Sequence, residues 1–185
     1  MQSDEDLIFE YINGVDDSFK VLVDRYIASI YNFSIRFVGN DYANDITQDV
    51  FLRVWKNIRK FNHKKANFKT WLFTIARNTI TDYLRKKKSI SFSSLNTEEE
   101  NFEETIEDEV ILPDEAMSKL EDKEFLNKLL DEIPGRYKEV LILYYQECMT
   151  FNEIGQLLDK PLNTVKSYHY RALSLLRKLI EGRDI

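Results

Sequence analysis

Side chains that can bind bases and phosphates recur at helical spacing near the C-terminus. Arginine, lysine, asparagine and serine reach base edges and phosphate oxygens through hydrogen bonds. After about residue 161, one predicted helix face carries Asn163, Lys166, Ser167, Tyr170, Arg171, Ser174, Arg177 and Lys178. The opposite face is apolar and predicted to be buried, with Val165, Tyr168, Ala172, Leu175, Leu176 and Leu179. Residues 160–183 carry six basic groups and one acidic group, so the polar face suits DNA.

A short helix and a turn precede this segment. Thr150 and Glu153 have the spacing of a capping box, in which two side chains satisfy free backbone amides at a helix start. The segment Asp159-Lys160-Pro161 supplies the turn because proline cannot continue the helix behind it. The pattern predicts a helix-turn-helix whose second helix enters the major groove. A solvated amphipathic helix in an ordinary bundle would show the same local spacing.

A second group of basic and aromatic residues lies in the first half of the chain. Residues 53–88 contain twelve basic residues and a single acidic one, Asp82. Aromatic residues lie among the basic ones: Phe68, Trp71, Phe73 and Tyr83 alternate with Lys64, Lys65, Lys69, Arg77 and the run 85–88. Such a mixture can hold single-stranded DNA by base stacking and phosphate attraction. Trp71 and Tyr83 are equally suited to a helical core.

A third group lies on a helix predicted from about residue 41 to residue 60. Its inner face is apolar, with Tyr42, Ile46, Val50, Val54 and Ile58. Its other face is mixed, with Asp45, Gln48, Asp49, Leu52 and Lys56. Charged helix faces are usually solvated, so the spacing leaves open both a binding surface and a plain exposed face.

The elements that must position these groups are helices. Hydrophobic residues make up 43% of the 185 residues, and only five glycines and three prolines are present, which favours long helices over turn-rich sheets. Helices are predicted over 4–12, about 68–86, about 113–132 and 136–147, and another carries the core stripe Phe19, Leu22, Tyr26, Ile30, Phe33 and Phe37. The predicted fold class is all-α, with two small helical domains.

The two domains are predicted to be joined by a flexible acidic linker. The formal net charge is −6, yet residues 89–118 contain ten acidic and no basic residues. Like-charge repulsion should keep residues 89–112 extended and mobile. The predicted domains are therefore residues 1–88 and residues 113–185, the second being the helix-turn-helix domain.

The sequence offers little for catalysis or metal binding. His63 and His169 are the only histidines, no glycine-rich phosphate loop occurs, and a single cysteine excludes an intramolecular disulfide or a multi-cysteine metal site. We predict no enzyme activity, cofactor, metal or small-molecule substrate. Cys148 lies in a tyrosine-rich stretch predicted to be buried. Neither a signal peptide nor a long apolar run is found, so we expect a soluble, cytoplasmic protein.

Taken in order, these pieces resemble the sigma-70 family of bacterial transcription initiation factors. The resemblance is to the extracytoplasmic-function (ECF) group, which has only the second and fourth conserved regions. It spans nearly the whole chain through DITQDVFLRVW at 45–55, FKTWLFTIARNTITDYLR at 68–85, IPGRYKEVL at 133–141, MTFNEIGQLL at 149–158 and PLNTVKS at 161–167. Residues 1–88 would then be sigma region 2, and residues 113–185 sigma region 4.

The resemblance implies a partner for each group of residues. Core RNA polymerase would bind through its β′ clamp helices and β subunit, with the clamp helices on Asp45, Gln48, Asp49, Leu52, Trp55 and Lys56. The promoter −10 element would be recognised and opened by Lys64, Lys65, Asn67, Phe68, Trp71, Arg77, Asn78, Thr81, Asp82 and Lys86. The −35 element would be read as duplex by Asn163, Thr164, Lys166, Ser167, Tyr170, Arg171 and Arg177. The family also implies control by an anti-sigma factor, often membrane-anchored.

Some positions depart from the usual family pattern. Asp159 stands where glycine is common, and Gly155 stands where alanine is common. Aspartate tolerates left-handed backbone, so we expect the turn to survive. His169 lies in a stretch that is more basic in relatives, and we expect it to pack against the core instead of contacting a base.

A stand-alone helix-turn-helix regulator is the alternative from another class of protein. Such a protein binds duplex DNA as a dimer and needs no polymerase. Its N-terminal half would not need an aromatic and basic surface for separated strands.

Overall fold

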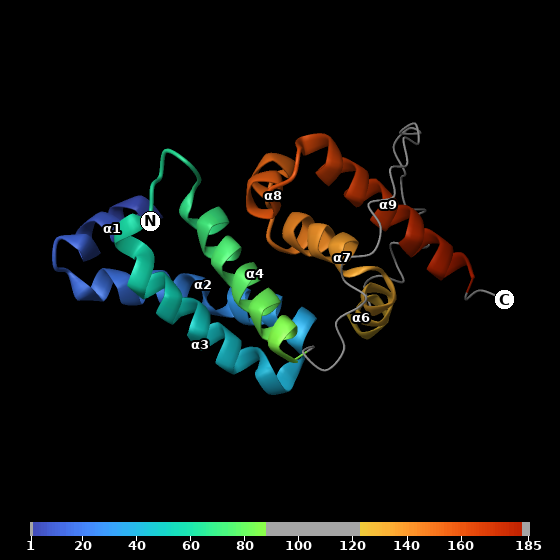
Figure 1. The fold of residues 1–185 in the computed structure, drawn as a ribbon, viewed down its shortest axis with the longest axis horizontal. Coiled ribbons are helices and arrows are strands. Elements are labelled where there is room, and N and C mark those ends of the chain that lie inside the picture. The colour runs from blue at the N-terminus through green and yellow to red at the C-terminus, as the bar shows by residue number, and fades with distance from the viewer. Residues whose placement is uncertain (1, 88–122, 183–185) are drawn as a thin grey trace. The chain divides into compact units, whose positions relative to one another are not determined.

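The computed structural model describes residues 2–87 and 123–182, and the chain divides into two compact helical units (Figure 1). Neither of these two ranges contains a strand, so the prediction of an all-α fold is confirmed. The predicted linker, 89–112, and the beginning of the next predicted helix, 113–122, lie outside the described residues. The division of the chain into domains and linker therefore stays a prediction.

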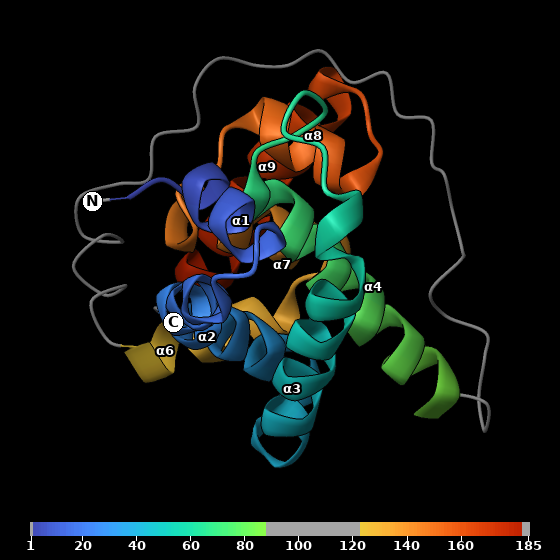
Figure 2. The same ribbon diagram turned by 90° about the vertical axis from the view of Figure 1, so that its left-hand side faces the viewer.

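The first unit consists of four α-helices and one short 3₁₀ turn within the described range. These are α1 (Asp4–Ile12), α2 (Asp16–Val38), α3 (Asn40–Asn57), η1 (Ile58–Lys60) and α4 (Phe68–Lys87). The helix expected from about residue 41 to residue 60 is thus α-helical only as far as Asn57. In both views α2, α3 and α4 lie beside one another and form the body of this unit (Figures 1 and 2).

Hydrogen bonds fix α1 at its start and against α2. The Asp6 amide donates to Ser3 Oγ at 3.1 Å, and the Ser3 amide donates to the Asp6 carboxylate at 3.3 Å, which completes a capping box. The Asp4 carboxylate pairs with Arg25 and accepts a hydrogen bond from Tyr26, both on α2. Burial and this hydrogen bond raise the pKa of Tyr26, which therefore stays neutral.

The core of the first unit is formed mainly by α2, α3 and α4. Its buried hydrophobic residues are Leu7, Ile8, Leu22, Ile30, Phe33, Ala43, Ile46, Val50, Val54, Ile58, Phe68, Leu72, Phe73, Ala76 and Ile80. The prediction that Tyr42 belongs to this core is wrong, because its side chain is 38% exposed and Ala43 is buried in its place. Tyr42 instead contacts Tyr83, with the ring centroids 5.2 Å apart.

The second unit contains α6 (Lys123–Glu132), α7 (Gly135–Leu141), η3 (Ile142–Gln146), α8 (Phe151–Leu158) and α9 (Leu162–Glu181). The helix expected over 136–147 changes at Ile142 to the wider π-helical pattern, in which the Glu147 amide donates to the Ile142 carbonyl at 3.1 Å.

Cys148 differs from its prediction. Its backbone is left-handed, with φ 53°, and its side chain is exposed instead of buried. The neighbouring Met149 is buried. The Met149 amide donates to the Leu143 carbonyl at 3.0 Å, which holds Met149 against η3 while the left-handed Cys148 stays in solvent.

The core of the second unit forms where α9 packs against α6, α7 and α8. One cluster of buried residues comprises Leu129, Leu130, Ile133, Tyr137, Leu141, Ala172, Leu173, Leu176 and Ile180. A long helix held by three others presents its remaining side to solvent. Among the described helices, none contains an apolar stretch that could span a lipid bilayer.

Candidate functional site

An apolar groove lies between α2 and α3. Leu52 and Trp55 of α3 are 53% and 52% exposed, although both side chains are large and apolar. The residues that line the groove are Phe19, Val23, Ile27, Thr47, Gln48, Phe51, Leu52 and Trp55. Exposed apolar side chains gathered in one groove are typical of binding surfaces.

The other predicted polymerase-binding residues on α3 are polar, and among them Gln48 lines the α2–α3 groove. Asp45, Gln48 and Lys56 are exposed, and Asp49 is half-buried. The buried residues of α3 point the other way: Ala43, Ile46, Val50 and Val54. The structure therefore brings all six predicted polymerase-binding residues onto one side of α3, where their role stays a prediction.

Sequence reasoning did not assign the α2 side of the groove. Phe19 was predicted to belong to the core stripe, but it is half-buried and lines the groove. Ile27, also in the groove, is 45% exposed. Val23 and Ile27 are apolar but lie outside the core stripe of α2. Their positions could have indicated from the sequence that a second apolar surface lies on this helix.

The loop 61–67 connects η1 to α4 and protrudes beyond the start of α4 (Figure 2). Asn62 organises its turn, because its side-chain oxygen accepts from the Lys64 amide at 3.0 Å and its carbonyl accepts from the Lys65 amide at 3.0 Å. Asn67 caps α4 by accepting a hydrogen bond from the Thr70 amide at 2.7 Å. The loop thereby holds Lys64 and Lys65 in solvent.

An aromatic cluster supports this loop from beneath. Phe61 lies 5.3 Å from Trp71 and 5.7 Å from Phe68, measured between ring centroids. Phe68 is only 1% exposed, so its predicted contact with DNA is corrected: the side chain is part of the core and anchors the start of α4. Trp71 is half-buried and keeps part of its ring accessible.

The outer face of α4 carries the other residues predicted to read the −10 element. Asn78, Thr81 and Lys86 are exposed, and Arg77 and Asp82 are half-buried. The last turn of α4 is basic, with Arg85, Lys86 and Lys87. The helix dipole favours positive side chains at the C-terminal end of a helix. Together these side chains form a basic surface that attracts phosphate.

The predicted helix-turn-helix is present in the second unit. The Glu153 amide donates to Thr150 Oγ1 at 3.3 Å, and the Thr150 amide donates to the Glu153 carboxylate at 2.7 Å, so the capping box at the start of α8 is confirmed. Asp159 is left-handed, with φ 53°, and ends α8. The expectation that aspartate can form this turn is confirmed.

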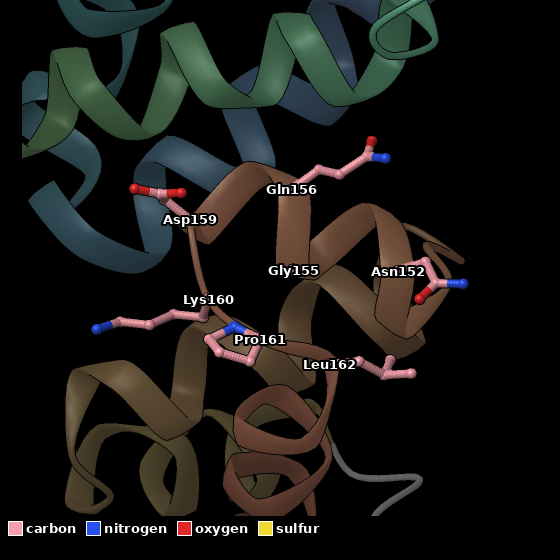
Figure 3. A pocket seen from close by; sticks show the side chains of 7 residues that line it. All are labelled: Asn152, Gly155, Gln156, Asp159, Lys160, Pro161 and Leu162. Carbon is pink, nitrogen blue, oxygen red and sulfur yellow. The ribbon is translucent and has the colours of Figure 1, made fainter.

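Gly155 explains why the turn is tight. The Lys160 amide donates to the Gly155 carbonyl at 3.0 Å, and a Cβ added at Gly155 would lie 3.0 Å from the Lys160 carbonyl oxygen. The turn at residues 159–161 then leads directly into α9. A hollow beside it is lined by Asn152, Gly155, Gln156, Asp159, Lys160, Pro161 and Leu162 (Figure 3).

The two sides of α9 differ in burial as the sequence suggests, with a shift in the buried stripe. Val165, His169, Ala172, Leu173, Leu176 and Ile180 are buried. Leu173 and Ile180 were missed, and Tyr168, Leu175 and Leu179 are only partly buried. The stripe is broader than a single helix contact would make it because α9 packs against three helices.

The polar side of α9 is accessible. Asn163 and Arg177 are exposed, and the half-buried residues are Thr164, Lys166, Ser167, Tyr170 and Arg171. Pro161 precedes α9, and among the described residues no side chain caps this helix start. Free amides in the first turn, together with the helix dipole, can bind a phosphate oxygen.

His169 packs inside an aromatic cluster, as predicted. It is 6% exposed, and its Nε2 lies 3.1 Å from the Tyr145 hydroxyl. The rings of Tyr144, Phe151 and Tyr170 complete the cluster. Burial lowers the pKa of His169, so the ring is neutral at physiological pH.

Comparison with known proteins identifies both units. Residues 22–90 match the family "Sigma-70 region 2", and residues 126–176 match "Sigma-70, region 4". The described residues contain no group of three or more histidine, cysteine, aspartate or glutamate side chains that could hold a metal ion.

Curated relatives share most of their length with this chain. The ECF RNA polymerase sigma factor SigW of Bacillus subtilis (strain 168) is 34% identical over 93% of this chain and 92% of its own. SigM of the same organism is 30% identical over 85% and 92%. The ECF RNA polymerase sigma-E factor of Escherichia coli (strain K12) is 27% identical over 92% and 90%.

Two solved structures have a similar fold. CnrH, in complex with the cytosolic domain of CnrY, has a TM-score of 0.71 at 20% identity, covering 98% of this chain and 99% of its own. The sigma factor RpoE from Bartonella quintana, in complex with the anti-sigma factor NepR, has a TM-score of 0.66 at 24% identity, covering 88% and 96%. The sequence relationship to SigW and the matches to both sigma regions show that this chain belongs to the ECF group of sigma-70 family RNA polymerase sigma factors, which are non-catalytic transcription initiation factors.

Proposed function

We propose that this chain binds core RNA polymerase, directs it to specific promoters by reading their −10 and −35 elements, and nucleates opening of the DNA strands. Residues 1–88 act as sigma region 2 and residues 113–185 as sigma region 4, with residues 89–112 between them. The matched ranges 22–90 and 126–176 support this assignment. RNA polymerase performs the catalysis.

The α2–α3 groove is the observation that carries the proposal. Leu52 and Trp55 offer large exposed apolar side chains beside Asp45 and Gln48. An amphipathic helix lays its apolar side into such a groove, and the resemblance to sigma factors implies that the β′ clamp helices dock here. The apolar contacts supply affinity, while the neighbouring carboxylates of Asp45 and Asp49 set orientation against basic side chains of polymerase.

Opening of the −10 element is assigned to the loop 61–67 and α4. Lys64 and Lys65 attract the phosphates, and Trp71 offers part of its ring for stacking. Extruding a base costs a few kcal/mol, which contacts with the loop and polymerase offset. Phe68 contributes by holding the loop and makes no DNA contact of its own.

Reading of the −35 duplex is assigned to α9. Its exposed start and the accessible side chains of Asn163, Lys166 and Arg171 suit the major groove. If Lys166 contacts a phosphate, Lys166→Ala lowers the salt slope of binding by about 0.9. If it contacts a base, the substitution costs roughly 1–3 kcal/mol and relaxes specificity at one position. Unchanged binding to −35 duplex would remove Lys166 from the reading surface.

We also propose regulation by an anti-sigma factor and a cytoplasmic location, where polymerase and DNA are found. A partner that covers Leu52 and Trp55 would prevent polymerase from docking. A purified candidate should compete with core polymerase for this chain, and Trp55→Ala should weaken both complexes. A candidate that binds without competing would contradict this mode of regulation.

Transcription in vitro tests the function as a whole. Core polymerase is incubated with genomic DNA, with and without this protein, and the 5′ ends of the transcripts are sequenced. We expect new start sites that share two upstream elements. Tight binding to duplex DNA without polymerase, together with no new start sites, would favour the stand-alone regulator.

A further inference from the structure

Arg53 lies on α3 where this helix faces α4, and it belongs to neither the polymerase-binding set nor the DNA-binding set. Its guanidinium contacts two carboxylates on different helices. Nε donates to Asp49 Oδ2 at 3.1 Å, and Nη1 donates to Asp82 Oδ2 at 3.2 Å. The other oxygen of Asp82, Oδ1, accepts a hydrogen bond from Arg85 Nη2 at 3.2 Å.

These four side chains alternate in charge across the first unit. The order is Asp49, Arg53, Asp82 and Arg85. Asp49 belongs to the predicted polymerase-binding set, whereas Arg85 belongs to the basic last turn of α4 and is 65% exposed. The chain of charges therefore begins at the surface assigned to polymerase and ends at the surface assigned to DNA.

We propose that Arg53 is a positioning residue that couples polymerase docking to DNA binding by controlling whether Arg85 is available to a phosphate. This inference rests on the proposed function. In the free protein Arg53 is shared between Asp49 and Asp82, so Asp82 retains Arg85. When a basic group of polymerase pairs with Asp49, Arg53 pairs with Asp82 alone. The ion pair between Asp82 and Arg85 then breaks, and the Arg85 guanidinium can bind a phosphate.

The coupling works in both directions because linkage is reciprocal. A phosphate that pairs with Arg85 breaks the ion pair between Arg85 and Asp82, which strengthens the ion pair between Asp82 and Arg53. Asp49 is then freed for polymerase. All four side chains are partly exposed, and pairs of this kind have small energies, so the coupling should change affinity about two- to five-fold.

Asp49→Asn imitates docking in the free protein, because it removes one of the two partners of Arg53. The probe is a fluorescein-labelled single strand with the −10 sequence of a promoter mapped by the transcription experiment. We expect Asp49→Asn to tighten binding about two- to five-fold beyond the matched control Asp45→Asn. The control removes the same charge from the same face of α3 at a residue outside the four-charge chain.

Two further backgrounds test the route through Arg53 and Arg85. In a protein that already carries Arg53→Gln, Asp49→Asn should change the affinity for the single strand only as much as Asp45→Asn does. In Arg85→Gln protein the gain in affinity should also disappear, whereas Lys86→Gln should leave it intact. Each phosphate that a protein neutralises on single-stranded DNA adds about 0.7 to the salt slope of binding, so the slope for Asp49→Asn protein should be steeper by about that amount.

The outcomes separate this inference from the proposed function. If no promoter is mapped, the proposed function fails. If promoters are mapped but the extra gain from Asp49→Asn persists in Arg53→Gln protein, the role of Arg53 is overturned. Melting temperatures of all variants should match the parent protein, since a merely structural role of Arg53 would lower them.

Discussion

The two units build their binding surfaces in different ways. In the second unit a single helix, α9, supplies the side chains assigned to the −35 element, and the adjacent turn at residues 159–161 orients that helix. In the first unit the groove assigned to polymerase needs both α2 and α3, and the surface assigned to the −10 element needs a loop packed on α4. A surface made by one helix depends on local geometry, whereas a groove between helices depends on long-range packing.

Removing the centre of the first core should produce the largest difference between the units. Phe33 is 1% exposed, and its ring centroid lies 5.3 Å from that of Phe73. Phe33→Ala should lower the free energy of unfolding by about 3–5 kcal/mol, because it removes a buried ring and leaves a cavity. Hydrogen exchange should become faster in α2, α3 and α4, with protection in α8 and α9 preserved. Equally fast exchange in α9 would show that the two units do not unfold independently.

The α2–α3 groove should separate binding from stability. Replacing both Leu52 and Trp55 by alanine should weaken core polymerase binding by about 2–4 kcal/mol, because large exposed anchors carry much of an interface's affinity. The free energy of unfolding should change by less than about 0.5 kcal/mol. Val21→Ala is the control, since Val21 is 45% exposed on α2 and does not line the groove. An equal drop in affinity in the two proteins would remove the groove from the interface.

The turn before α9 should respond to backbone conformation alone. Asp159 has φ 53°, a conformation that costs a β-branched residue about 1–2 kcal/mol. Asp159→Val should therefore lower the free energy of unfolding of the second unit by about that amount, while Asp159→Gly should maintain or raise it. Thermal unfolding measures both. A stable Asp159→Val protein would show that the turn is not held in this conformation.

Acidification should produce the mildest effect, through His169 in the second unit. Burial lowers the pKa of His169 from its ordinary value of 6.5, so the unfolded chain binds a proton at higher pH than the folded chain. The stability present above pH 6.5 is consequently lost as the pH falls from 6.5 through the lowered pKa. His169→Phe keeps an aromatic ring and should flatten this dependence in thermal unfolding.

The matched control for this titration is His63, which is exposed in the loop of the first unit. His63→Gln should leave the pH dependence of the second unit unchanged. If His169→Phe left the pH dependence unchanged, its assignment to His169 would be wrong.

Local features of the second unit were predictable from the sequence. The spacing of Thr150 and Glu153, and the tolerance of Asp159 for left-handed backbone, are chemical properties of a few neighbouring residues. Each acts within one or two helical turns, so no knowledge of the rest of the chain is needed. The exact stripe buried on α9 was less predictable, since it depends on which three helices pack against it.

In the first unit, the burial of several aromatic side chains could not be predicted from the sequence. Phe68 and Trp71 were both candidates for DNA contact, yet Phe68 is buried and Trp71 is half-buried. Tyr42 was expected inside but lies at the surface with Tyr83. Periodicity places a residue on a helix face, but the depth of burial depends on the neighbouring helices at that point along the axis.

The all-α class, the helix-turn-helix and the resemblance to ECF sigma factors follow from the amino-acid sequence alone, because helical periodicity, caps and motifs are encoded over short stretches. The packing of the helices was needed to show that Phe19, Val23 and Ile27 join Leu52 and Trp55 in one groove. It was also needed to place Arg53 between Asp49 and Asp82. Asp82 is far from Arg53 in sequence, and such contacts form only when packing brings two helices together.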